Sequence, residues 1–156
     1  ILRDWSSDVC SSDLPKEGTG MVQLIVGVKG TGKTKKMLDH VHESIKNVEG
    51  NIVYLDKSSQ NMHELDNKVR LINVSEYPID TTDQFIGFVC GICSQDYDLQ
   101  EMYLDGFLKI ARLEGQDISS ALSQLNKISE QFKVNMVLSV SMDEKDLPDF
   151  AKSQVI

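Results

Sequence analysis

A phosphate-binding pattern lies close to the start of the chain. The pattern G-x-x-x-x-G-K-[ST] is matched by Gly27, Val28, Lys29, Gly30, Thr31, Gly32, Lys33 and Thr34. In such a loop, glycines allow successive backbone N–H groups to surround phosphates, the lysine reaches the β- and γ-phosphates, and the final hydroxyl coordinates Mg²⁺. The sequence therefore predicts a P-loop, and we expect it to bind a nucleoside triphosphate, namely ATP with Mg²⁺.

The loop residues have separate expected roles. We expect Lys33 to act in catalysis and Thr34 to be a magnesium ligand, while Lys29 and Thr31 contribute backbone amides. The expected nucleotide contacts run from Gly27 through Lys35. An apolar run ends at the loop, and an amphipathic pattern begins after it, so the loop should connect a strand to a helix N-terminus that favours anions.

Magnesium also needs a nearby acid, normally an Asp at the carboxyl end of a buried strand. Asp105 follows the apolar residues 102–104 and lies far enough along the chain for other strands to intervene, which is where RecA-like ATPases carry this acid. We therefore predict Asp105 as a catalytic residue and metal ligand. Asp56, after the apolar run 52–55, is the alternative and suits a ribose or substrate contact as well. Asp143 is expected to be a solvated loop acid.

The residue after the predicted metal-binding acid bears on hydrolysis. RecA-like ATPases often have a water-activating Glu there, but this chain has Gly106. Fast hydrolysis is therefore not expected, unless Glu101 or Glu114 approaches the site through the fold. Ser139 and Ser141 occupy positions where related ATPases sense the γ-phosphate, and we interpret them as ordinary strand serines.

Apolar runs and helical patterns alternate along the chain and define the fold class. Strands are expected at 21–26, 51–56, 69–74, 101–105 and 134–140. Helices are expected from 33 to about 50, after a capping box at Thr81 and Gln84, and at 117–132. Such alternation gives parallel pairing and right-handed crossovers. It predicts a three-layer α/β/α P-loop NTPase fold with a mostly parallel five-stranded sheet, RecA-like in type.

The N-terminal residues are expected to stand outside this fold. Residues 4–14 read DWSSDVCSSDL, which resembles the translation of a sequencing adapter. We expect residues 1–20 to be a disordered, artefactual extension and 21–156 to form a single domain beginning at Met21.

Composition restricts the partners. The formal net charge is −8, and two of the 16 basic and four of the 24 acidic residues lie in 1–20, which leaves 14 against 20. This acidic balance argues against non-specific nucleic-acid binding. No run of 18 apolar residues occurs, so no membrane span is expected, and the protein should be cytoplasmic. Cys90 and Cys93 should be reduced, packed residues. Either Arg70 or Arg112 could stabilise a transferring phosphate in cis or in trans, but we expect a surface ion pair for both.

Four segments of the chain carry a resemblance to known proteins: residues 21–27, the P-loop with Lys35 and Lys36, residues 87–92 and residues 108–110. From Met21 onward the chain resembles a group of short bacterial P-loop proteins of uncertain role, some of which are labelled twitching-motility ATPases. The resemblance covers nearly all of the expected domain and implies ATP binding. True twitching-motility motors are similar only at the P-loop and are much longer.

Three functions are compatible with these features. The first is a slow ATPase or nucleotide-dependent switch. It could act with a protein partner or as a homo-oligomer. The second is a small-molecule kinase of nucleoside type, in which Asp56 or Glu64 orients an acceptor hydroxyl. The third is a non-hydrolysing ATP-binding interaction module, which the glycine at position 106 favours.

Overall fold

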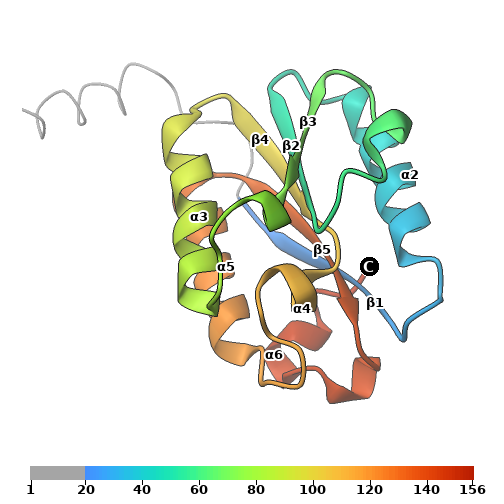
Figure 1. Cartoon of the computed structure of the whole chain (residues 1–156), viewed down its shortest axis with the longest axis vertical. Helices are drawn as coiled ribbons and strands as arrows, with labels where there is room; N and C mark the ends of the chain where they lie inside the picture. The colour runs from blue at the N-terminus through green and yellow to red at the C-terminus, as the bar shows by residue number, and fades with distance from the viewer. Residues whose placement is uncertain (1–19) are drawn as a thin grey trace, which may run out of the picture.

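The structure, a computed structural model, describes residues 20–156 (Figure 1). The predicted extension therefore lies outside the described residues, apart from Gly20. The longer elements are β1 (Val22–Gly27), α2 (Lys33–Ile45), β2 (Asn51–Asp56), β3 (Val69–Asn73), α3 (Thr82–Gln95), β4 (Leu99–Leu104), α5 (Ser119–Phe132) and β5 (Asn135–Ser141). The short ones are η1 (Met62–Glu64), η2 (Val74–Glu76), α4 (Phe107–Ile110), η3 (Glu144–Asp146) and α6 (Asp149–Lys152).

The five strands form one sheet in the order β1-β5-β4-β2-β3, and every pair is parallel. The predicted α/β class is confirmed, and the sheet is wholly rather than mostly parallel. β5, the last strand in sequence, lies between β1 and β4. All strand carboxyl ends consequently meet at one edge of the sheet, where the loops after β1, β2 and β4 come together.

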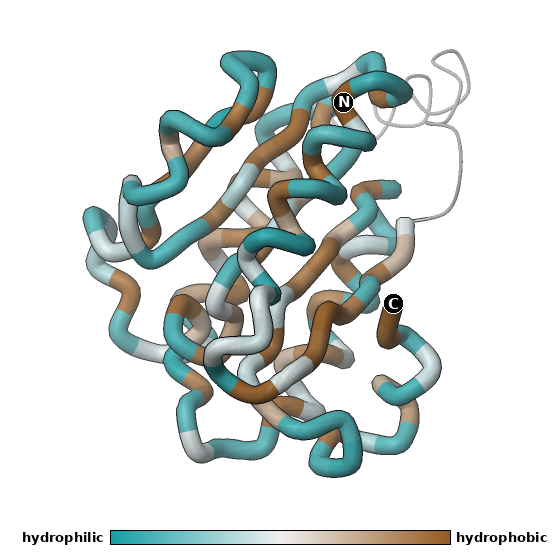
Figure 2. The backbone as a smooth tube through the Cα atoms, turned by 90° about the vertical axis from the view of Figure 1, so that its right-hand side faces the viewer, coloured by the Kyte–Doolittle hydropathy of each residue, from teal (hydrophilic) through white to brown (hydrophobic). Residues whose placement is uncertain are grey.

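Helices cover both faces of the sheet. Adjacent residues of a strand point to opposite faces, so each strand contributes side chains to the packing on both sides. Leu55 and Leu104 belong to a core cluster with α3 and α5, whereas Tyr54 and Tyr103 belong to a second cluster with α2. In Figure 1, α2 accordingly lies on one side of the sheet and α3 with α5 on the other. Figure 2 shows hydrophobic segments concentrated along the strands and hydrophilic ones in the outer loops.

Local sequence signals explain several element ends. The predicted capping box is confirmed: Thr81 Oγ1 accepts from Gln84 N at 3.2 Å, and Gln84 Oε1 accepts from Thr81 N at 3.2 Å. Such caps stabilise a helix by about 1 kcal/mol. α2 begins at Lys33 as predicted but ends at Ile45, before the expected end near residue 50. β4 begins at Leu99, two residues earlier than predicted.

The C-terminal residues protect one sheet edge. Leu24 N donates to Gln154 O at 2.9 Å, and Ile156 N donates to Leu24 O at 2.9 Å, so this segment lies beside β1. It and the short helices α4 and α6 were not predicted. Within residues 20–156, no helix combines the length and apolar character needed to cross a membrane.

Candidate functional site

The predicted phosphate-binding loop connects β1 to α2. Gly30 and Gly32 have φ values of 90° and 78°, in the left-handed region that favours glycine. Gly27 is needed for a different reason, since a Cβ there would lie 2.5 Å from Thr31 Oγ1. Thr31 Oγ1 in turn donates to Val28 O at 2.8 Å, which closes the loop on itself. The backbone conformation thus favours glycine at Gly30 and Gly32, and the contact with the Thr31 side chain favours it at Gly27.

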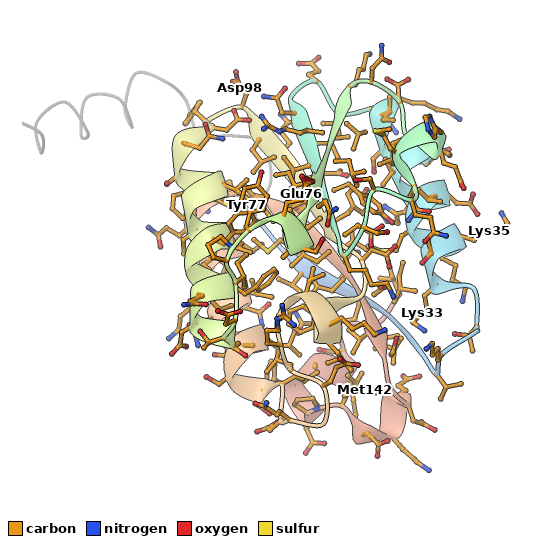
Figure 3. All side chains as sticks on the ribbon, viewed as in Figure 1. Lys33, Lys35, Glu76, Tyr77, Asp98 and Met142 are labelled. Carbon is orange, nitrogen blue, oxygen red and sulfur yellow. The ribbon has the colours of Figure 1, made fainter. Side chains whose placement is uncertain are left out.

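Lys33 points inward from the first turn of α2. Its side chain is buried, and Nζ donates to Val28 O at 3.0 Å across the loop. Burial lowers the pKa of Lys33, and the negative charge of Asp105 partly opposes that shift. Lys35 extends away from the sheet in Figure 3 and pairs with Asp39 at 3.1 Å on the exposed helix face. The two lysines therefore have different surroundings.

Asp105 lies at the turn after β4 and is the centre of a buried hydrogen-bond network. The residue is 6% exposed, and its carboxylate accepts hydrogen bonds from three hydroxyl groups. Ser139 Oγ donates to Oδ1 at 2.8 Å and Thr34 Oγ1 to the same oxygen at 3.4 Å, whereas Tyr54 Oη donates to Oδ2 at 2.8 Å. The network joins the carboxylate to β5, α2 and β2, so Asp105 is fixed from three sides.

Gly106 has a conformational role in this turn. Its φ is 71°, and its N–H donates to Ser139 Oγ at 2.7 Å. Ser139 therefore accepts from Gly106 and donates to Asp105, which holds the turn and the carboxylate in one geometry. Our interpretation of Ser139 as an ordinary strand serine missed this role. Tyr54 was missed as well, because its sequence position marks it only as a residue of a buried strand.

Asp56 ends β2, beside β4 in the sheet. The residue is 4% exposed, and its carboxylate accepts hydrogen bonds from Lys57 N at 2.7 Å and from Asn61 Nδ2 at 2.8 Å. Burial and the nearby charge of Asp105 raise the pKa of Asp56, and the two hydrogen bonds and the Lys57 charge oppose the shift. Both predicted metal-binding acids are thus brought to the same edge of the sheet.

A cavity of about 750 Å³ opens between these loops. Its lining residues are Val28, Lys29, Gly30, Gly32, Lys33, Thr34, Asp56, Lys57, Ser58, Gln60, Asn61, Asp105, Gly106, Leu108, Lys109, Glu114, Gly115, Ser139 and Ser141. Cavities of about 300–1,000 Å³ hold small-molecule ligands. Of the predicted contacts, Gly27, Thr31 and Lys35 do not line the cavity.

The structure separates the two other acids considered for water activation. Glu114 lines the cavity, in the loop between α4 and α5. Glu101 does not, because its Oε1 accepts from Tyr103 Oη at 2.7 Å on the side of the sheet that packs against α2. Glu64, considered for an acceptor, is exposed and also outside the lining.

The chain matches no protein-family model, and none of the curated proteins matches it either. The chemistry available is visible in the residues themselves. Among the described residues there is no group of three or more His, Cys, Asp or Glu side chains suited to a metal ion. Thr34, Asp105 and Asp56 instead offer one hydroxyl and two carboxylates. Hard oxygen ligands of this kind suit Mg²⁺ when phosphate oxygens and water complete its coordination.

Proposed function

We propose that the chain is a P-loop protein of RecA-like type that binds ATP with Mg²⁺ and acts as a slow ATPase or a nucleotide-dependent switch. One observation carries the proposal. The Thr34 hydroxyl lies 3.4 Å from the Asp105 carboxylate, 71 residues away in sequence, and both line the cavity beside the buried Lys33. A hydroxyl, a carboxylate and an ammonium group at the mouth of a glycine-rich loop are the groups needed to bind a magnesium–phosphate complex.

The strand order supports the RecA-like assignment. Asp105 lies far enough along the chain for other strands to intervene, and in the sheet β5 lies between β1, which leads into the loop, and β4, which leads into Asp105. The same order gives β5 a direct contact with the site. Ser139 on β5 hydrogen-bonds to Asp105, and Ser141 lines the cavity.

The groups present fit a nucleotide with its metal. Thr34 and Asp105 would hold Mg²⁺, which neutralises phosphate charge when bound. Lys33 donates to Val28 O at 3.0 Å, and this hydrogen bond can be exchanged for one to a phosphate oxygen. No acid lies within 4 Å of Lys33 among the described residues, so its charge is available for an anion.

The surroundings of Asp105 favour slow turnover. Gly106 supplies no carboxylate, and Glu114 is the cavity acid in the neighbouring loop that is left to orient water.

The second candidate function, a small-molecule kinase, is favoured by Asp56, since a buried carboxylate at the cavity wall can accept a proton from an acceptor hydroxyl.

Nucleotide binding and phosphate release, measured together on the full chain, test the proposal. ATP and GTP are compared with and without Mg²⁺ for the parent, Lys33→Ala and Asp105→Asn, with Lys36→Ala as an exposed control on the same helix. We expect the parent to bind ATP in a Mg²⁺-dependent manner. Lys33→Ala should abolish this binding, and Asp105→Asn should make it insensitive to Mg²⁺. Lys36→Ala should leave it intact. Absence of ATP binding to the parent would refute the proposal. Binding without phosphate release would support the switch, and transfer to an added hydroxyl compound would support the kinase.

A further inference from the structure

A second, smaller cavity adjoins the proposed nucleotide site. It has a volume of about 260 Å³ and is lined by Lys57, Val74, Ser75, Lys109, Ile110, Arg112 and Glu114. Lys57, Lys109 and Glu114 line both cavities, so the two spaces share a wall. A volume below the range of drug-sized ligand sites suits one small polar group rather than a whole nucleotide.

Three cations from separate segments meet at this second cavity. Lys57 follows β2, Lys109 belongs to α4, and Arg112 lies in the turn after α4. Within residues 20–156, the ion pairs involve other residues, so none of these three cations has a carboxylate within 4 Å. The chain has a net charge of −8, so a cluster of basic side chains without acidic partners differs in charge from the chain as a whole.

Arg112 has an unfavourable backbone conformation, and hydrogen bonds hold it in place. Its φ of 58° lies in the left-handed region, which residues with a side chain seldom adopt. Nε donates to Ile79 O at 3.1 Å, and Thr82 Oγ1 donates to the adjoining Ala111 O at 2.8 Å. Our sequence interpretation of Arg112 as a surface ion pair is wrong for the described residues. The terminal amino groups of its guanidinium make no hydrogen bond to those residues, so they remain available to a ligand.

We propose that Lys57, Lys109 and Arg112 form a second anion subsite, which binds the phosphate group of a small phosphorylated molecule beside the nucleotide. This proposal rests on the proposed function, which supplies the neighbouring nucleotide. Its geometry comes from the residues that line both cavities. Lys and Arg together suit a phosphate because the two ammonium groups supply point charges and the guanidinium a planar pair of donors. Glu114 lines both cavities, and its negative charge should weaken anion binding there.

Amide NMR of the full ¹⁵N-labelled chain, saturated with Mg²⁺ and a non-hydrolysable ATP analogue, tests the subsite. Inorganic phosphate and glycerol 3-phosphate are titrated separately, with sodium chloride matched for ionic strength and glycerol as the uncharged control. We expect saturable shifts around residues 57, 75, 109 and 112 with both phosphates and no saturable shift with chloride or glycerol. Tighter binding of glycerol 3-phosphate would identify a phosphate ester as the ligand, and tighter binding of inorganic phosphate would identify the free anion.

Variants that remove a positive charge and a variant that removes a negative charge should change phosphate affinity in opposite directions. Lys57→Gln and Lys109→Gln should each weaken phosphate binding by about tenfold, the loss of one charge-assisted contact, whereas Glu114→Gln should tighten it. Lys127→Gln, an exposed lysine on α5, is the matched control and should leave the affinity unchanged.

Two results would overturn the subsite. One is the absence of any saturable phosphate shift at these residues. The other is weaker binding of the ATP analogue, but not of ADP, in Lys57→Gln and Lys109→Gln, which would mean that these lysines contact the γ-phosphate of the same nucleotide. Titration of nucleotide-free Lys33→Ala with phosphate separates this proposal from the first. Shifts at Lys57 and Lys109 in that variant would support the subsite even if the parent binds no nucleotide.

Discussion

Replacing Tyr54 by Phe should weaken the site without disturbing the packing around it. The Tyr54 side chain is fully buried, and its ring stacks on Tyr103 with centroids 6.0 Å apart, a contact that Phe preserves. What is lost is the 2.8 Å hydrogen bond to Asp105 Oδ2. Hydrogen bonds to charged groups contribute about 1.5–3 kcal/mol. A loss of about 2 kcal/mol lowers Tm by roughly 4–8 °C in a chain of this size.

The second consequence concerns magnesium. Burial and the charge of Asp105 raise the pKa of Tyr54, so its hydroxyl keeps its proton and remains a donor throughout the accessible pH range. Without that donor one Asp105 oxygen is no longer oriented, and we expect the Mg²⁺ concentration needed for half-maximal ATP binding to rise. Thermal denaturation and nucleotide binding at several Mg²⁺ concentrations measure the two effects separately.

Tyr103→Phe is the matched control for this experiment. Tyr103 is equally buried on the adjacent strand, and its hydroxyl contacts a carboxylate as well, Glu101 Oε1 at 2.7 Å, together with His40 and Ser44. Its loss should lower Tm similarly but leave the Mg²⁺ dependence unchanged, since none of those partners lines the cavity. Equal Mg²⁺ dependence in the two variants, or an unchanged Tm in Tyr54→Phe, would refute the reasoning.

Three further substitutions test the surroundings of the site. Because the pKa of Asp56 is raised above its ordinary value of 3.8, the folded chain binds this proton more tightly than the unfolded chain, and stability is lost as pH rises from 3.8 through the raised pKa. Asp56→Asn should therefore raise Tm at about pH 7 and reduce that pH dependence; a lower Tm at neutral pH would contradict it. Gly106→Ala meets no atom within 4 Å of the new Cβ but places it at a φ of 71°, so it should cost about 1–2 kcal/mol in the free energy of unfolding, measured by urea denaturation. Lys35→Ala removes only an exposed pair with Asp39, worth about 0.3–0.5 kcal/mol, and should leave ATP affinity unchanged; a large loss would restore Lys35 to the binding site.

The sequence was sufficient for the fold class because each core strand has an apolar run and each long helix a periodic stripe. All five predicted strands occur, and the Thr81–Gln84 capping box marks the start of α3 as expected. Short elements escaped prediction for a physical reason. α4 and α6 have four residues each, too few for a helical period, and they are stabilised by burial of Phe107, Ile110 and Ala151 against the sheet.

The candidate site divides in the same way. The loop and its two candidate acids were visible as local patterns, because glycine spacing and a strand-terminal Asp are written within a few residues. Tyr54 was not considered, Ser139 was interpreted as an ordinary strand serine, and Glu114 could not be separated from Glu101. Their roles depend on which strands are neighbours and which loops face one another. Lys57 carries no local signal either, because its relevance comes from lining both cavities together with Lys109.

The turn after β4 links the magnesium site that we propose to the slow hydrolysis that we propose. The left-handed backbone of Gly106 directs its N–H to Ser139 Oγ at 2.7 Å, and that hydroxyl in turn orients Asp105. A glutamate at this position would have to adopt the same backbone, at a cost of about 1–2 kcal/mol. The geometry that fixes the carboxylate therefore disfavours an adjacent water-activating acid. If turnover occurs, the base has to come from another loop, and Glu114→Gln should then reduce phosphate release while ATP binding persists.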